Sequence, residues 1–204
     1  MTALDKYLHP SSFDLDPFEY YRFGTLVDAI ITEAEKVNYF NRTVEGEELP
    51  YTQEAFEKAT EMKKAFRKDP FCSHILPLAS FQKIFIESVN LQYCGLPFSL
   101  MMRCKYDLWM NALSWGGDIK STAAKTQKQF EEACRYFDYD RQRAVYMTLS
   151  GAKRDVLIGI YKENFKVFKI TIERGDAFYN AGMEKFTDLA FKYWLLFENF
   201  NIKT

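Results

Sequence analysis

Two carboxylates and one ammonium group lie close together in the middle of the sequence. Asp107 comes near the end of a segment that alternates apolar and polar residues, and Asp118 and Lys120 follow the next turn. Side chains two residues apart on a strand point to the same face, so Asp118 and Lys120 share a face and Ile119 takes the other. If the turn makes the two strands antiparallel, Asp107 and Asp118 come side by side.

Converging carboxylates are the ligands that hard divalent cations such as Mg²⁺ prefer. A bound cation of this kind activates water and neutralises charge during phosphodiester hydrolysis, and the Lys120 ammonium can orient the water or offset developing charge. An Asp-x-Lys tripeptide alone also occurs by chance on solvated strands. The pattern predicts a hydrolytic site in which Asp107, Asp118 and Lys120 are catalytic.

The elements that must position these groups follow from periodicity and turn residues. Five helices are expected, at about 16–36 (with Asp16 as cap and Pro17 in the first turn), 52–69, 125–137, 140–149 and 176–197. Five strands are expected at 81–93, 99–110, 118–120, 156–161 and 165–172, with a polar loop at 41–49. This order predicts an α/β fold with a central mixed β-sheet flanked by helices, in one domain over 1–204.

Composition limits the class of protein. The chain has 204 residues, of which 48% are hydrophobic, enough for one sizeable core. Its 27 basic and 28 acidic residues nearly cancel, which excludes a strongly basic nucleic-acid binder, so any DNA contact needs a local basic surface. The basic residues after the catalytic strand form either a solvated face or a phosphate-tracking surface: Lys125, Lys128, Arg135, Arg141 and Arg143.

The cysteines and the first residues suggest a compartment. The four cysteines are scattered without a CxxC pair, and only His9 and His74 could supplement them, so a zinc finger or redox pair is not expected. The amino terminus has no apolar signal core, and no apolar run is long enough to span a bilayer. We therefore expect a cytoplasmic protein with reduced thiols and no membrane partner.

Five segments resemble, in order, the motifs of one nuclease family. They are Phe23-Gly24-Thr25-Leu26-Val27-Asp28, Glu87, the strand segment 103–107, Asp118-Ile119-Lys120-Ser121-Thr122, and Gln142-Arg143-Ala144-Val145-Tyr146. They are similar to the FGTxxH element, the acid that opens the sheet, the strand that ends in the first catalytic Asp, the DxKT core and the helical QxxxY signature. The chain thus resembles the RecB/RecE-like exonucleases of the PD-(D/E)XK superfamily, which include phage lambda-type exonucleases.

This resemblance implies a restriction-endonuclease-like fold and a Mg²⁺-dependent exonuclease, with Mn²⁺ as a substitute, that resects linear duplex DNA to 5′-phosphates for recombination or repair. It implies DNA as partner and allows a single-strand annealing protein and a homo-oligomeric ring. The implied metal ligands are Asp107, Asp118, the Ile119 carbonyl, and Glu87 or Asp28. The implied substrate-positioning residues are Gly24, Thr122, Gln142 and Tyr146.

One position departs from the family pattern, because Asp28 stands where the family has histidine. A catalytically attenuated protein that binds DNA or a recombination partner is therefore an alternative, and an unrelated protein with a coincidental Asp-Ile-Lys is a third. Simpler interpretations also exist for single residues: Glu87 as an exposed strand position, Gly24 as a helix kink, Tyr146 as a core residue. The aromatic residues Trp109, Trp194 and Phe197 are expected in the core rather than as base-stacking platforms.

Overall fold

The central element of the fold is a five-stranded mixed sheet. In a computed structural model that describes residues 17–199, the strand order is β3-β4-β5-β6-β7, with β5 and β6 parallel and every other pair antiparallel. The expected cap at Asp16 and His9 lie outside the described residues. The strands are β3 (Ala79–Tyr93), β4 (Leu96–Met110), β5 (Trp115–Thr122), β6 (Arg154–Tyr161) and β7 (Val167–Glu173).

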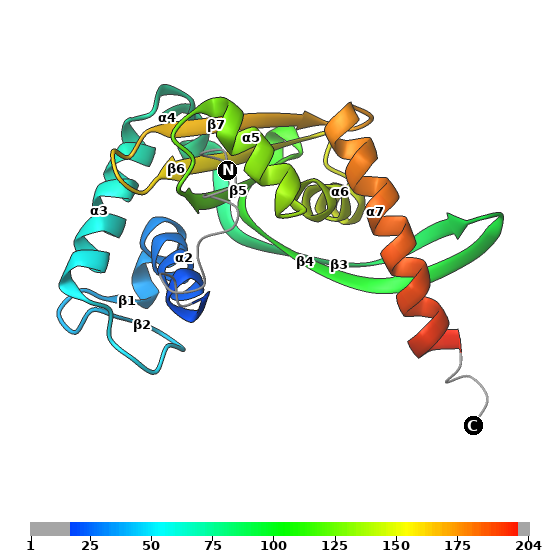
Figure 1. Cartoon of the computed structure of the whole chain (residues 1–204), viewed down its shortest axis with the longest axis horizontal. Coiled ribbons are helices and arrows are strands. Elements are labelled where there is room, and N and C mark those ends of the chain that lie inside the picture. Colours follow the sequence, from blue (N-terminus) through cyan, green and yellow to red (C-terminus); the bar gives the residue numbers. More distant parts are fainter. Residues whose placement is uncertain (1–16, 200–204) are drawn as a thin grey trace, which may run out of the picture.

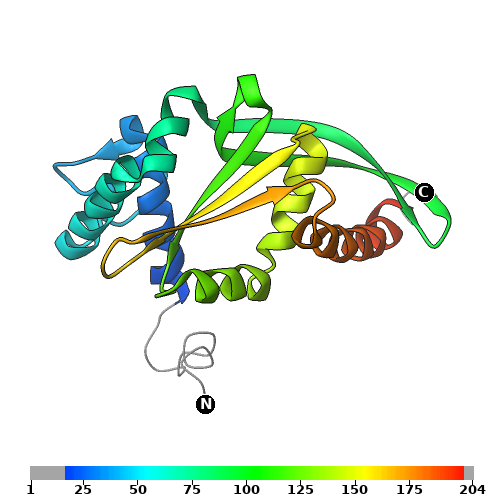
Figure 2. The ribbon, with the colours of Figure 1, turned by 90° about the horizontal axis from the view of Figure 1, so that it is seen from above.

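Helices cover both faces of this sheet (Figures 1 and 2). One face carries α2 (Pro17–Thr32), α3 (Gln53–Lys68) and α4 (Pro70–Ile75). The other carries α5 (Gln127–Tyr136), α6 (Tyr139–Ser150) and α7 (Ala177–Tyr193). Because β6 is covered on both faces, Val156 and Ile158 join one apolar cluster and Leu157 joins the other. The predicted α/β fold with a mixed sheet flanked by helices is confirmed.

Polar side chains set where several helices begin. The hydroxyl of Thr52 accepts a hydrogen bond from the backbone of Ala55, which starts α3 at the expected place. Asp69 accepts hydrogen bonds from two backbone N–H groups and starts α4, a short helix not predicted from the sequence. Thr126 and Asp176 cap α5 and α7 in the same way.

The amino-terminal region differs from its prediction in two respects. The expected helix ends at Thr32 and runs without a break through Gly24; a 3-10 turn, η1 (Ala34–Lys36), follows. The expected polar loop contains one strand of a small hairpin, β1 (Val37–Asn38) and β2 (Thr43–Val44). None of the helices within residues 17–199 combines the length and apolar character needed to cross a bilayer.

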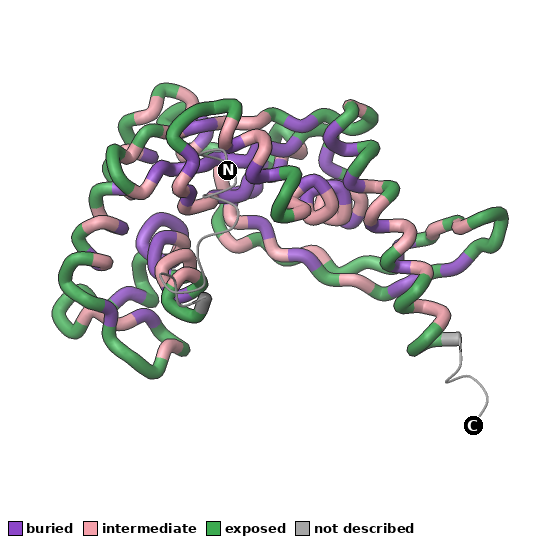
Figure 3. Tube along the Cα trace, in the orientation of Figure 1, coloured by how far each residue is buried: buried purple, intermediate pink, exposed green. Residues whose placement is uncertain are grey.

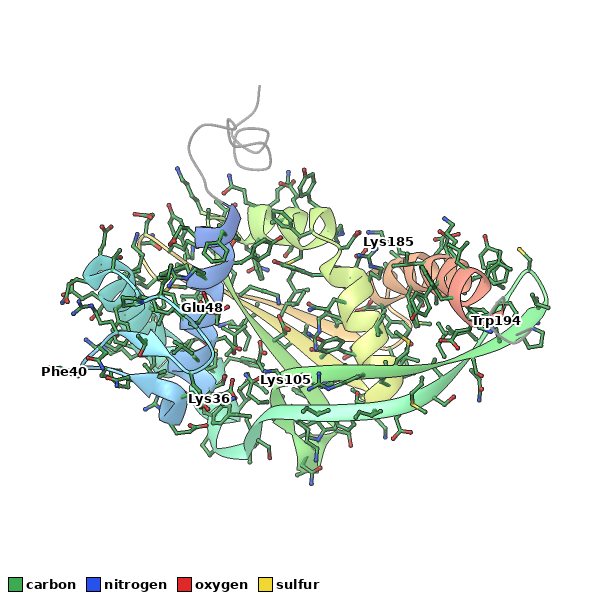
Figure 4. All side chains as sticks on the ribbon, turned by 90° about the horizontal axis from the view of Figure 1, so that it is seen from below. Lys36, Phe40, Glu48, Lys105, Lys185 and Trp194 are labelled. Atoms are coloured by element: carbon green, nitrogen blue, oxygen red, sulfur yellow. The ribbon has the colours of Figure 1, made fainter. Side chains whose placement is uncertain are left out.

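The hairpin of β3 and β4 reaches beyond the rest of the sheet, and α7 crosses it near its tip (Figure 1). Figure 3 shows that this arm is much less buried than the centre of the sheet. The ring of Tyr93 stacks on Phe191 with centroids 4.3 Å apart, and Phe98 lies 5.5 Å from Trp194, the first residue of the terminal π-helix η4 (Trp194–Asn199) (Figure 4). Trp109 is buried as expected, whereas Phe197 is exposed, which corrects its expected core position.

The glycines at the start of β5 allow a close approach between strand and core. A Cβ atom added at Gly116 would lie 1.9 Å from the ring of Tyr106, whereas one added at Gly24 in α2 meets nothing within 4 Å. We predict that Gly116→Ala lowers the free energy of unfolding by about 3 kcal/mol through overpacking, and that Gly24→Ala raises it by about 0.5 kcal/mol through helix propensity. Urea denaturation measures both; equal shifts would contradict the described packing.

Candidate active site

The predicted catalytic residues lie where β4 and β5 separate, and this place is called the fork. The two strands pair only from Leu108 to Met110, against Trp115 to Gly117. Just beyond the last pair, the Asp107 carboxylate accepts a hydrogen bond from the backbone N–H of Ile119 at 2.8 Å. The carboxylate thus satisfies a backbone donor at the fork, in place of a strand partner.

Asp118 and Lys120 lie on the face of β5 that packs against α6, as the period of two predicts. Lys120 Nζ is 2.6 Å from Asp118 Oδ2 and 4.9 Å from the ring of Tyr139. Ile119 points to the opposite face, into the cluster with α2 and α3. Asp118 is only 3% exposed, while the Lys120 side chain is 21% exposed, so Lys120 lies between Asp118 and solvent.

Asp28 approaches the fork from α2. Its Oδ1 accepts hydrogen bonds from Thr32 Oγ1 at 3.0 Å and from Gln82 Nε2 at 3.1 Å. Gln82 lies in β3 opposite Asp107 and has a φ of 54°, an uncommon conformation for a residue with a side chain. Lys105 lies on the same strand as Asp107 (Figure 4), and its positive charge acts to lower the pKa of Asp28.

A pocket of about 370 Å³ opens over this arrangement, a volume within the usual range for a small-molecule site. Its lining includes Asp28, Asp107, Ile119 and Lys120, together with the backbone and side chains of α2 around Gly24. Three tyrosines also line it: Tyr20, Tyr21 and Tyr139. The pocket therefore gives solvent access to two of the predicted carboxylates and to the predicted ammonium.

Other predicted site residues lie elsewhere. Glu87 is exposed, pairs with Met102 in the projecting hairpin and stands five residues along β3 from Gln82. Gln142 lines a separate apolar groove of about 420 Å³ between β4, α6 and α7. Thr122 is buried at the end of β5, where its hydroxyl accepts a hydrogen bond from Ala124 N at 3.1 Å. Tyr146 is half-buried and lines the same groove as Gln142, with the centre of its ring 4.4 Å from the guanidinium of Arg143.

Arg143 and Asp155 were missed as parts of this arrangement. Arg143 is fully buried, which corrects its expectation as a solvated or phosphate-tracking residue. It donates to Asp118 Oδ1 at 2.7 Å and, through Nε and Nη2, to Asp155 Oδ2 at 3.0 Å each. Helical spacing in the sequence could have indicated the face on which Arg143 lies, because Arg143 and Met147 are four residues apart and share the buried face of α6.

The carboxylates differ in how readily they ionise. Burial raises the pKa of Asp107 well above its usual range, and the charges of Asp118 and Asp28 raise it further. Burial also raises the pKa of Asp28, with Asp118 adding to the effect. Burial acts in the same direction on Asp118, but Lys120 and Arg143 outweigh it and the pKa of Asp118 is lowered. Asp118 is therefore the ionised member and Asp107 the one that resists ionisation.

The oxygen donors around the fork are of the type that suits Mg²⁺ or Mn²⁺, and like-charge repulsion between Asp107 and Asp118 is what a cation would relieve. Both Asp118 oxygens, however, contact cationic side chains. Among residues 17–199, no group of three or more acidic, histidine or cysteine side chains is already arranged to hold a metal ion. The donor chemistry fits a divalent cation. Such a cation would share Asp118 Oδ2 with the Lys120 ammonium.

Comparison with known proteins supports the fold. No family model and no curated sequence matches the chain. A putative exonuclease from Eubacterium rectale has a similar structure, with a TM-score of 0.54 and 14% identity over 88% of this chain and 68% of that one. A phage-related exonuclease from Haemophilus somnus matches with a TM-score of 0.41 and 12% identity over 94% of this chain and 90% of that one. A third solved protein, whose name states no activity, has a TM-score of 0.43 and 13% identity over 73% of this chain, and the match spans 63% of its own length.

The opposite pKa shifts generate a stability prediction. The destabilisation caused by Asp107 grows from pH about 3.9 up to its raised folded pKa and stays constant above that pKa. Asp107→Asn should therefore raise the melting temperature in EDTA at pH 7. Asp118 has a lowered pKa, so its contribution is present above pH about 3.9 and is lost as the pH falls through the folded value.

Asp118→Asn should therefore destabilise the protein, by about 3 kcal/mol at pH 7, because it removes the charge that Arg143 and Lys120 share. Differential scanning fluorimetry across pH compares the two variants. Shifts of the same sign at pH 7 would contradict this assignment of charge.

Proposed function

We propose that this chain is a divalent-cation-dependent nuclease that hydrolyses DNA phosphodiesters, with Mg²⁺ as cofactor and Mn²⁺ as substitute. The observation that carries the proposal is the fork itself. Asp107 is hydrogen-bonded to the Ile119 backbone, and the Asp118–Lys120 ion pair lies on the same strand as Ile119. Asp28 lines one pocket together with Asp107 and Lys120. This combination of acids and one ammonium around splayed strands suits phosphodiester hydrolysis.

Each residue has a role in this proposal. Asp107, Asp118 and the Ile119 carbonyl would hold the cation, with Asp28 facing it from α2; the cation would activate water and neutralise charge on the phosphate. Lys120 orients the attacking water or offsets the developing negative charge. Gly24 lies in the pocket wall, where the absence of a side chain leaves room for substrate. Thr122 stabilises the end of β5 through its hydrogen bond with Ala124. Glu87, in the projecting hairpin, and Gln142, in the separate groove, have no role in this proposal.

The substrate we propose is a linear duplex end, cut exonucleolytically to 5′-phosphates for recombination or repair. Two things support it: the likeness of fold to a protein named as a putative exonuclease, and the ordered motifs of the sequence. The volume of the pocket is suited to one nucleotide rather than to a duplex. A single-strand annealing protein and a homo-oligomeric ring stay predictions from the family resemblance.

A specific observation favours a second candidate function, a DNA-binding protein with little or no cleavage. Both oxygens of Asp118 contact cationic side chains, and Asp28, where the family has histidine, is tied to Thr32 and Gln82. This candidate predicts that the purified chain retains duplex DNA in an electrophoretic shift assay with Mg²⁺, with no product over long incubation. The nuclease proposal predicts shortened strands under the same conditions.

The nuclease proposal is tested by removing the ammonium. We expect wild-type protein to degrade linear duplex DNA with Mg²⁺, EDTA to stop it, and Lys120→Ala to reduce kcat by about 100-fold or more, because the charge nearest Asp118 is lost. Lys64→Ala, at a side chain that is 57% exposed on α3, is the matched control and should cut normally. Cleavage that survives both EDTA and Lys120→Ala would refute the mechanism.

A further inference from the structure

Arg143 makes more hydrogen bonds to carboxylates than Lys120, the other cation that contacts Asp118. Its guanidinium donates to Asp155 through Nε and Nη2 and to Asp118 through Nη1, so three donors have defined acceptors. The rings of Tyr106 and Tyr146 lie 4.9 and 4.4 Å from it. Asp155 is itself fully enclosed at the start of β6. The orientation of the guanidinium is thus determined by two carboxylates and two aromatic rings.

The consequence for Asp118 is an unequal division of its two oxygens. Oδ1 accepts from Arg143, whose side chain is 0% exposed, at 2.7 Å. Oδ2 lies 2.6 Å from Lys120 Nζ, and Lys120 lines the pocket. The carboxylate therefore has a core side, occupied by the buried guanidinium, and a pocket side, occupied by the partly exposed Lys120 ammonium.

We propose that Arg143 is a positioning residue for the proposed nuclease site. By holding Asp118 Oδ1 from the core, it assigns Oδ2 to cations in the pocket, where the Lys120 ammonium and a divalent metal ion compete for the same oxygen. The proposal rests on the proposed function for its metal, and on the contacts of Arg143 for its geometry. A lysine at this position cannot reproduce the planar set of guanidinium donors, because it offers one ammonium to two separated carboxylates.

The first test measures metal binding directly in the full-length protein. Mn²⁺ affinity is followed by electron paramagnetic resonance of free Mn²⁺, and cleavage of a blunt linear duplex gives kcat and KM. We expect Arg143→Lys to raise the Mn²⁺ dissociation constant about tenfold, the effect typical of groups that orient metal ligands, with KM for DNA unchanged and kcat recovering at high Mn²⁺.

The control separates positioning from loss of stability. Leu149→Ala removes a buried side chain from the same helix, outside the charged network. It should lower the melting temperature and leave the Mn²⁺ affinity of the folded protein unchanged. If Arg143→Lys behaves like Leu149→Ala, the positioning role is overturned. Should Arg143→Lys not fold, Asp155→Asn replaces it: weaker Mn²⁺ binding supports the proposal and unchanged binding overturns it.

A second variant tests the competition at Oδ2. Lys120→Met keeps the length of the side chain without its charge, so Mn²⁺ should bind more tightly than to the wild type; equal or weaker binding overturns the competition. These outcomes are distinct from failure of the proposed function. Wild-type protein that neither binds Mn²⁺ nor cuts DNA rejects the nuclease, whereas wild-type binding with unchanged Arg143→Lys affinity rejects only the role of Arg143.

Discussion

The charges gathered around the separation of β4 and β5 impose the main constraint on this structure. Four aspartates, Asp28, Asp107, Asp118 and Asp155, share this region with the cations Lys120 and Arg143. If every carboxylate ionised, these six groups would carry a net charge of −2, which Lys105, shared with Glu33, offsets only in part. A divalent cation would neutralise such an excess. Without such a cation the raised pKa values of Asp107 and Asp28 reduce the imbalance, because a protonated carboxyl is easier to bury.

The order of elements and the centre of the site could be predicted from the sequence. Alternation in the segment before Asp107 and the period of two in Asp118-Ile119-Lys120 are local properties of a strand, and the structure keeps them. The alternation stops at Asp107, because Tyr106 and Leu108 join opposite apolar clusters. The predicted strand 118–120 proved longer, because Trp115 to Gly117 pair with β4 on one side and with β6 on the other. Short glycine-containing segments carry little strand signal of their own, so their pairing depends on neighbours.

Which residue of β3 lies opposite Asp107 depends on the register of the strands, and alternation alone does not provide that register. Cys94 and Gly95, both with positive φ, form a two-residue turn between Tyr93 and Leu96. Counting outward from that turn places Gln82, and not Glu87, opposite Asp107. The Arg143 network was harder to foresee, since a charged residue is expected at a surface and the acid that buries it, Asp155, lies twelve residues away on another element.

The contact between the hairpin tip and α7 joins parts of the chain that are made at very different times. Tyr93 donates a hydrogen bond to Asp188, 95 residues later, and stacks on Phe191. During synthesis the tip of the arm therefore emerges well before the helix that holds it, and its aromatic side chains stay uncovered until the last helix forms. Closing so long a loop is entropically costly and slow. The outer part of the arm is thus expected to become ordered last, after the sheet that carries Asp107 and Asp118 has already assembled.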